Sequence, residues 1–247
     1  MKKSEPYTGI AEAYDYILRH VDYDQWFKYI NSIMIKYIPN PQSILELGCG
    51  TGKFGAKFSA ANYKIYGIDR SFSMLRVAKT RAFRSFRIIC ADMKNFSLKG
   101  NFDFIFSVHD TMNYQLTTNE IRQVLRCVKR IMHEKSIFLF DITTEHNINS
   151  FFNNKTSFYK TRGMNIEWSN RYIKKKKFII STFSIHYEDG RVFREEHTQR
   201  IYSMNEIEMI LHEEGFEIVE IFSDYTYNPP SDDTIMINFI TKKRDRA

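Results

Sequence analysis

A short apolar run followed by three closely spaced glycines constrains this chain more than any other feature. The run covers residues 44–47, and the glycines are Gly48, Gly50 and Gly52. Glycines directly after a buried strand let the backbone turn sharply and lie against a ligand, because a side chain there would occupy the ligand's space. The pattern therefore predicts a parallel sheet with a ligand at the carboxyl end of its first strand.

The spacing of these glycines argues against a dinucleotide site. The dinucleotide pattern G-x-G-x-x-G requires a glycine at position 53, where this chain has Lys53. Glu46 precedes the loop, and a carboxylate there is unfavourable beside a pyrophosphate but suits a ligand that carries an ammonium or sulfonium charge. A nicotinamide oxidoreductase is therefore the least favoured of the enzyme classes considered.

Two further carboxylates follow the next two predicted strands. Asp69 ends the second strand, and Asp92 follows the third. Asp69 can accept hydrogen bonds from both hydroxyls of a ribose, whereas Asp92 can accept one from an adenine amino group while Met93 packs on the ring. Three acids at successive strand ends predict a nucleoside site without phosphate recognition.

Apolar segments and helical patterns alternate along most of the chain, which predicts an α/β fold with a parallel sheet and helices on both faces. A closing hairpin of two strands follows the last helix. We expect strands at 44–47, 64–68, 86–90, 102–108, 136–141, 216–225 and 234–241, and helices at 10–18, 23–37, 53–60, 73–82, 119–133 and 205–214.

The alternation stops after residue 141. Residues 143–165 are polar and irregular, and three β-rich runs follow at 166–173, 178–187 and 191–202. Asp189 and Gly190 supply the tight turn between the last two runs, so these runs predict an antiparallel meander. We therefore expect a core of residues 1–142 and 203–247, with an inserted β-rich lid or substrate subdomain over 143–202.

Three motifs resemble those of class I S-adenosylmethionine-dependent methyltransferases: residues 46–52 (E-L-G-C-G-T-G), residues 67–69 (G-I-D) and residues 91–93 (A-D-M). The core with an antiparallel lid is similar to small bacterial enzymes such as the amino-sugar N-methyltransferases. The resemblance implies a Rossmann-like seven-stranded sheet and S-adenosylmethionine as cofactor. It implies cofactor contacts from Tyr14, Glu46, Gly48, Cys49, Gly50, Asp69, Arg70, Met74, Ala91, Asp92, Met93 and Val108. For Tyr14, packing within a buried aromatic stripe is an equal explanation.

His109 and Asp110 follow the fourth strand, where a methyl acceptor would stand, and they are the candidates for a general base. Related enzymes commonly carry an apolar residue at the position of His109, and a loop histidine satisfied by its neighbours is the alternative. The substrate-side candidates are Asn113, Tyr114, Trp168, His197 and Arg200, for which wall packing or cross-strand packing is an equal explanation.

The charge balance leaves two other functions open. The net charge is +7, and residues 145–200 hold eleven Lys or Arg against six Asp or Glu. The run Lys174–Lys177 is either a solvated hairpin end or a phosphate contact. RNA methylation is therefore an alternative to methylation of a small molecule, and a non-catalytic regulator that binds S-adenosylmethionine is another.

Cysteine usage and hydropathy indicate in which cellular compartment the protein would work. Three cysteines, an odd number, favour a reducing cytoplasm over a disulfide framework, and no His or Cys spacing suggests a metal site. The apolar runs are far shorter than the ~20 residues of a membrane span. We expect a cytoplasmic enzyme that acts on a small molecule, without metal or membrane; the acceptor and the oligomeric state stay open.

Overall fold

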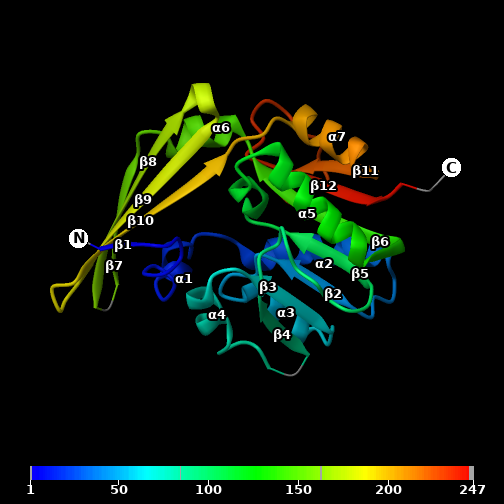
Figure 1. Ribbon diagram of the computed structural model, residues 1–247, viewed down its shortest axis with the longest axis horizontal. Coiled ribbons are helices and arrows are strands. Elements are labelled where there is room, and N and C mark those ends of the chain that lie inside the picture. The colour runs from blue at the N-terminus through cyan, green and yellow to red at the C-terminus, as the bar shows by residue number, and fades with distance from the viewer. Residues whose placement is uncertain (1, 84, 162, 245–247) are drawn as a thin grey trace.

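The structure is a computed structural model of the 247-residue chain, and it describes residues 2–83, 85–161 and 163–244. Two sheets organise the molecule (Figure 1). A seven-stranded sheet with helices around it forms the core, and a five-stranded sheet extends from one side of this core. We call the second sheet the lid sheet.

The core sheet has the strand order β11-β12-β6-β5-β2-β3-β4. The five strands β2 to β6 run parallel, and β12 lies antiparallel between β6 and β11. The predicted fold class is confirmed. The strand order reverses between β2 and β5, where α/β sheets leave a crevice at their carboxyl edge. The strands are β2 (Ile44–Leu47), β3 (Ile65–Asp69), β4 (Phe86–Cys90), β5 (Phe102–Ser107), β6 (Met132–Thr143), β11 (Phe216–Ser223) and β12 (Met236–Lys243).

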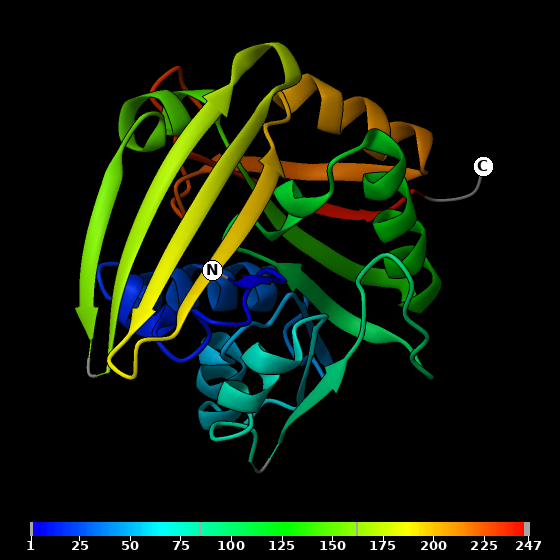
Figure 2. The same cartoon turned by 60° about the vertical axis from the view of Figure 1, so that its left-hand side comes forward.

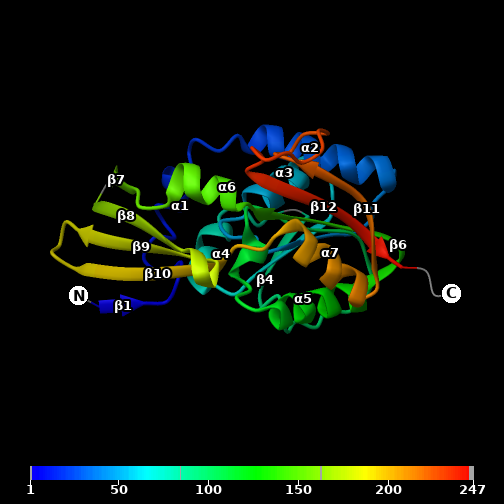
Figure 3. The same cartoon turned by 90° about the horizontal axis from the view of Figure 1, so that it is seen from above.

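Helices cover both faces of the core sheet, as Figure 3 shows from above. Apolar residues of α5 and α7 pack on one face, and those of α2 and α3 pack on the other. Capping boxes begin α5 and α7, because Thr117 and Ser203 each accept from the amide three residues later. The helices are α2 (Tyr23–Tyr37), α3 (Lys53–Ala60), α4 (Phe72–Ala78), α5 (Thr118–Ile131) and α7 (Met204–Glu213).

The lid sheet has the order β1-β10-β9-β8-β7, and Figure 2 shows its strands side by side. The expected antiparallel meander corresponds to β8, β9 and β10, whereas β7 and β1 extend the sheet at its two edges. The Asp189–Gly190 turn connects β9 to β10. The lid strands are β1 (Lys2–Ser4), β7 (Thr156–Thr161), β8 (Met164–Ile173), β9 (Phe178–Tyr187) and β10 (Val192–Arg200).

Two segments differ from the sequence-based expectation. The interval 143–165, expected to be irregular, contains β7, the short helix α6 (Glu145–Asn147) and the π-helical turn η2 (Ile148–Phe152). Its edge strand β7 is mostly exposed and so lacks the apolar alternation that marks a strand. The helix expected over 10–18 is the single turn α1 (Tyr14–Ile17), and Tyr7 before it adopts a positive φ of 63°.

The basic run between β8 and β9 forms a tight surface turn, η3 (Lys174–Lys176). Lys177 lies 3.0 Å from Glu206, and Lys174 lies 4.0 Å from Glu145. These contacts favour the solvated hairpin end over a phosphate contact. In the part of the chain that the structure describes, no helix combines the length and apolarity that crossing a membrane requires.

Candidate functional site

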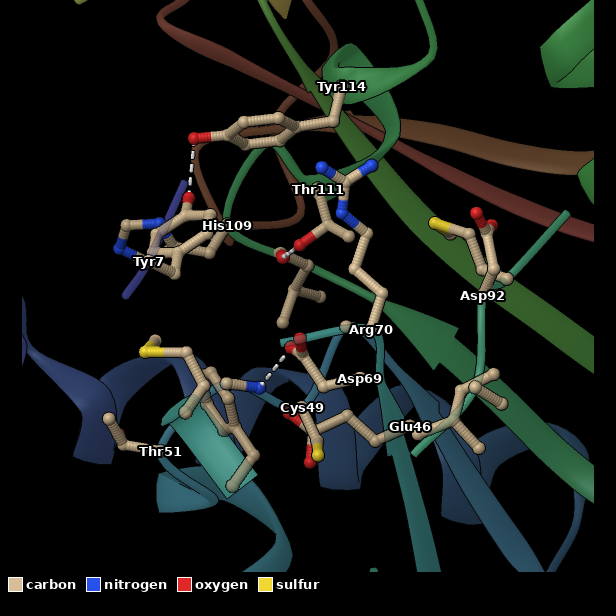
Figure 4. Close-up of a pocket in the computed structure, with 18 of the residues that line it drawn as sticks. Tyr7, Glu46, Cys49, Thr51, Asp69, Arg70, Asp92, His109, Thr111 and Tyr114 are labelled. Atoms are coloured by element: carbon tan, nitrogen blue, oxygen red, sulfur yellow. Dashed lines mark hydrogen bonds between the residues drawn. The ribbon is translucent and has the colours of Figure 1, made fainter. Parts of the chain in front are cut away.

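A pocket opens at the carboxyl edge of the core sheet, beside the glycine loop (Figure 4). Its walls come from the ends of β2, β3, β4 and β5 and from the N-terminal segment. All twelve residues expected to contact a cofactor line it: Tyr14, Glu46, Gly48, Cys49, Gly50, Asp69, Arg70, Met74, Ala91, Asp92, Met93 and Val108. The structure thus brings together residues that are up to 94 positions apart.

The glycine loop turns against the sheet edge. Gly48 and Gly50 have φ values of +72° and +52°, a region that side chains disfavour. The amides of Gly48 and Cys49 both donate to the carbonyl of Ile68, at 2.8 and 2.9 Å. A Cβ on Gly48 would lie 2.4 Å from Cγ2 of Thr111, so only glycine fits there without movement of the wall. The loop therefore presents bare backbone to the pocket.

Asp69 holds the loop from the end of β3. Its carboxylate accepts hydrogen bonds from the backbone amides of Gly50 and Ser71, both at 2.8 Å, and Figure 4 shows the first as a dashed line. Burial raises the pKa of Asp69, and these two amides oppose that rise by favouring the carboxylate. The carboxylate is thus fixed at the pocket edge.

Glu46 lies beneath the pocket, and one of its carboxylate oxygens has no hydrogen-bond partner. The residue is 2% exposed, and its Oε2 has no hydrogen-bond partner. Burial, followed by the nearby charge of Asp69, raises the pKa of Glu46 well above its usual range. A buried carboxylate oxygen without a partner is costly, and a cationic group in the pocket would offset that cost.

The side of the pocket next to β4 contains Asp92 and Met93. Oδ1 of Asp92 accepts from the Lys94 amide at 2.8 Å, and Sδ of Met93 lies 3.3 Å from Nε2 of Gln115. The pocket is also lined by three residues that the sequence analysis did not predict as cofactor contacts: Lys94, Thr111 and Gln115. Gln115 and Thr111 carry no local signal, because a turn after β5 places them there.

The N-terminal segment covers the glycine loop. Asp15 accepts from the hydroxyl of Thr51 at 2.7 Å and from the guanidinium of Arg81 at 2.6 Å. The rings of Tyr7 and Tyr14 pack edge to face, with centroids 5.5 Å apart, over the pocket. Residues far from the loop in sequence thus form its cover.

A second, larger cavity of about 810 Å³ lies between the core and the lid sheet, and we call it the chamber. Apolar side chains, among them Trp26, Phe152 and Phe183, make up much of its wall. Of the expected substrate-side residues, Tyr114, Trp168 and His197 line it. Four residues line both the chamber and the pocket, and they mark the junction between the two: Tyr7, Tyr14, His109 and Tyr114.

His109 and Asp110 form a strained turn at this junction. Their φ values are +64° and +50°, and the buried carboxylate of Asp141 accepts from both backbone amides, at 2.7 and 2.8 Å. The hydroxyl of Tyr225 also donates to Asp141. Asp110 lines the chamber, whereas His109 lines both cavities. Backbone held in the left-handed region by a buried anchor is a common feature of functional sites.

The imidazole of His109 lies among aromatic rings. Its centroid is 5.3 Å from that of Trp26 and 6.2 Å from that of Tyr23, and its Nε2 is buried without a partner. Burial lowers the pKa of His109, but the carboxylates of Asp110 and Asp141 outweigh this effect and raise it overall. The ring thus lies at the border between the two cavities.

Asn113 and Arg200 do not line either cavity, which corrects the expectation that they face the substrate. The buried amide of Asn113 donates to the carbonyl of Arg200 at 2.7 Å and accepts from the amide of Thr143 at 3.0 Å. The guanidinium of Arg200 bonds to Glu206 at 2.9 Å. Both residues join the lid to the core instead.

No group of three or more His, Cys, Asp or Glu side chains suited to a metal ion occurs among the described residues.

Part of the core is similar to a known protein family. Residues 44–135 match the family model described as a methyltransferase domain. YqeM of Bacillus subtilis, whose own naming as a methyltransferase is provisional, is 28% identical over 96% of this chain and 97% of its own length.

Two solved structures share the fold. An S-adenosylmethionine-dependent methyltransferase from Clostridium acetobutylicum has a TM-score of 0.83 and 24% identity, covering 97% of this chain and 99% of its own. The sugar N-methyltransferase KedS8 from a Streptoalloteichus species has a TM-score of 0.75 and 18% identity, covering 94% of this chain and 93% of its own. The similarity includes the lid as well as the core.

Proposed function

We propose, from the premise that residues 44–135 form a methyltransferase domain in a chain with the S-adenosylmethionine-dependent methyltransferase fold, that this protein methylates a nitrogen or oxygen of a small molecule. The observation that carries the proposal is the junction. Tyr7, Tyr14, His109 and Tyr114 line both the pocket and the chamber. A methyl donor in one cavity and an acceptor in the other would meet there.

The pocket suits S-adenosylmethionine by its donor and acceptor groups. The bare backbone at Gly48 supports close approach of a ligand, and the carboxylate of Asp69 at the pocket edge is our candidate acceptor for ribose hydroxyls. The unpartnered Oε2 of Glu46 favours a cationic ligand. Asp92 and Met93 line the same pocket, and they are our candidates for contact with the adenine. When bound, the cofactor supplies an electrophilic methyl group on a positively charged sulfur.

The chain's own residues position the reactants and exclude water. Tyr7 and Tyr14 cover the pocket from the N-terminal segment, and the lid sheet closes the chamber. Orientation in a dry site supplies much of the rate enhancement for such a transfer. His109, with Asp110 beside it, stays the sequence-based prediction for a group that holds the acceptor's proton.

The chamber favours a small acceptor over RNA. Of the described residues that line it, Lys155 is the one lysine or arginine, and aromatic and aliphatic side chains dominate the wall. A volume of about 810 Å³ suits a small molecule. RNA binding relies on cationic surface that tracks phosphates, which this chamber lacks. KedS8, similar over nearly the whole fold, acts on a sugar nitrogen, which supports a small amine or alcohol as acceptor.

Cofactor binding is tested by calorimetric titration with S-adenosylhomocysteine. Asp69→Asn should weaken binding about 5- to 150-fold, the loss expected for a charged hydrogen-bond acceptor. Asp189→Asn is the matched control, because Asp189 lies exposed at the β9–β10 turn and should bind as the wild type does. Unchanged affinity of Asp69→Asn would contradict the ribose assignment.

The acceptor class is tested with S-adenosylmethionine that carries a tritiated methyl group. The protein is incubated separately with the dialysable fraction of an extract of its source cells and with RNA purified from the same cells. We expect label in the dialysable fraction. Label confined to RNA would replace the small-molecule proposal with RNA methylation, and label in neither pool despite tight cofactor binding would favour a non-catalytic regulator.

A further inference from the structure

A continuous chain of hydrogen bonds leads from the junction into the lid sheet. The hydroxyl oxygens of Tyr7 and Tyr114 are 2.5 Å apart, and Figure 4 marks this hydrogen bond with a dashed line. The hydroxyl oxygen of Tyr114 is 3.2 Å from Nδ1 of His197. Nε2 of His197 is 3.3 Å from Oε2 of Glu195. His197 and Glu195 are buried, at 3% and 0% exposure. We call these four residues the relay.

The carboxylate at the buried end sets the direction of every bond in the relay. Oε1 of Glu195 already accepts from the backbone amide of Gly9 and from the hydroxyl of Ser4, so Oε2 is the oxygen left for His197. An ionised carboxylate can only accept, and Nε2 of His197 must therefore donate to it. Nδ1 of the neutral ring is then an acceptor.

The same reasoning orients the two phenols. Because Nδ1 of His197 accepts, the hydroxyl of Tyr114 donates to it, and the hydroxyl of Tyr7 donates in turn to the oxygen of Tyr114. Burial raises the pKa of both Tyr7 and Tyr114, so both remain phenols rather than phenolates. Their remaining lone pairs, at the junction, are hydrogen-bond acceptors. They suit a substrate atom that carries a proton.

Glu195 is a fully buried carboxylate that faces the imidazole of His197. Among the side chains that the structure describes, Glu195 pairs with His197 and with no lysine or arginine. A buried carboxylate without a cation is costly, because desolvation is not repaid by an ion pair. An imidazolium at His197, 3.3 Å from Oε2, would complete the ion pair that this carboxylate lacks.

We propose that Tyr114 is the catalytic residue that removes the proton from the methyl acceptor, with His197 and Glu195 as positioning residues behind it. The inference rests on the proposed methyl transfer and narrows its acceptor to a molecule whose reacting atom bears N–H or O–H. The acceptor's proton passes to the Tyr114 oxygen while the Tyr114 hydroxyl proton passes to Nδ1 of His197. One proton would leave the acceptor, one imidazolium would form beside Glu195, and the freed electron pair would make the new bond to the methyl carbon. The bond between that carbon and the donor sulfur would break in the same step, and its electron pair would stay on the sulfur.

The first test needs no methyl acceptor, so its result does not depend on whether the proposed function is correct. Nitrogen-15 NMR of histidine-labelled protein, with His197 assigned by comparison with His197→Gln, should show a neutral ring protonated at Nε2. Tyr114→Phe should shift the Nδ1 resonance, because it removes the donor to that nitrogen. Tyr16→Phe is the matched control, since Tyr16 lies half-exposed outside both cavities. A ring protonated at Nδ1, or no shift in Tyr114→Phe, would overturn the relay.

The second test measures tritium transfer from S-adenosylmethionine to the dialysable fraction. Tyr114→Phe and His197→Gln should each lower the rate about 100-fold or more, as expected when a proton acceptor is lost, while the affinity for S-adenosylhomocysteine stays within about twofold. His109→Gln should lower the rate less than either of these two variants does. A full rate in Tyr114→Phe, or a loss confined to His109→Gln, would refute the assignment. Absence of transfer by the wild type would instead count against the proposed function.

Discussion

Thr111 lies so close to Gly48 that a methyl group on Gly48 would stand 2.4 Å from Cγ2 of Thr111. The two residues come from different strand ends, since Gly48 follows β2 and Thr111 begins the turn after β5. This contact determines how tightly the glycine loop packs against the wall of the pocket. Gly48 is therefore required for two reasons: its positive φ, and the lack of space for a side chain beside Thr111.

Gly48→Ala should destabilise the protein by about 2 to 5 kcal/mol, because it combines a positive φ with overpacking. Gly190→Ala is the matched control: its φ is +84°, but no atom lies within 4 Å of the added Cβ, and it should cost about 1 to 2 kcal/mol. Urea denaturation measures both. Adding Thr111→Ala to Gly48→Ala should recover part of the loss, and equal costs for the two single variants would contradict the steric argument.

Glu46 should make cofactor binding depend on pH. Burial and the charge of Asp69 raise its pKa in the free protein, and a cationic ligand favours the carboxylate, so binding should release a proton. The affinity for S-adenosylmethionine should therefore rise with pH over the range in which Glu46 of the free protein loses its proton. Calorimetric titration should show a weaker dependence in Glu46→Gln. A parallel pH dependence in both proteins would exclude Glu46 as its source.

Asn113→Ala should destabilise the protein by about 1 to 3 kcal/mol, since it leaves the amide of Thr143 and the carbonyl of Arg200 without their buried partner. The affinity for S-adenosylhomocysteine should stay unchanged, because Asn113 lies outside both cavities. Urea denaturation and calorimetric titration check the two parts. Weakened cofactor binding without a stability loss would restore Asn113 to the site.

Asp141 should give the native state a stability component that is lost as the pH rises. Burial raises its pKa to about 7 in the folded protein, against ~3.9 in an unfolded chain, while Tyr225 and two backbone amides oppose the rise. The contribution is fully present below about pH 4 and is lost as the pH rises towards about 7. Relative to Asp141→Asn, the wild type should lose up to about 4 kcal/mol of unfolding free energy over that range. Urea denaturation at several pH values measures the difference; a constant difference would contradict the raised pKa.

The core sheet and the residues around its glycine loop could be predicted because their signals are local. A buried strand, three glycines and an acid at each strand end occupy short stretches of sequence, and the parallel topology brings their carboxyl ends together. Thr111 and Gln115 could not be found in this way. They reach the pocket only because the turn after β5 folds back against the loop.

The lid shows where local reasoning fails. Strand alternation places His197 and Arg200 on opposite faces of β10, because they are three residues apart, and so both could not face the chamber. Strand β1 carries no apolar pattern and forms only because β10 offers a free edge. The relay likewise joins residues up to 190 positions apart, and no sequence period links them.

The pairing of β1 with β10 joins the lid sheet to the N-terminal segment that covers the pocket. Ser4 lies opposite Glu195 in this pairing, and the segment that follows β1 carries Tyr7 and Tyr14 over the pocket. A displacement of the lid sheet large enough to admit an acceptor would draw that segment with it. An opening that admits the acceptor would therefore also uncover the pocket, so that the two cavities would open and close together.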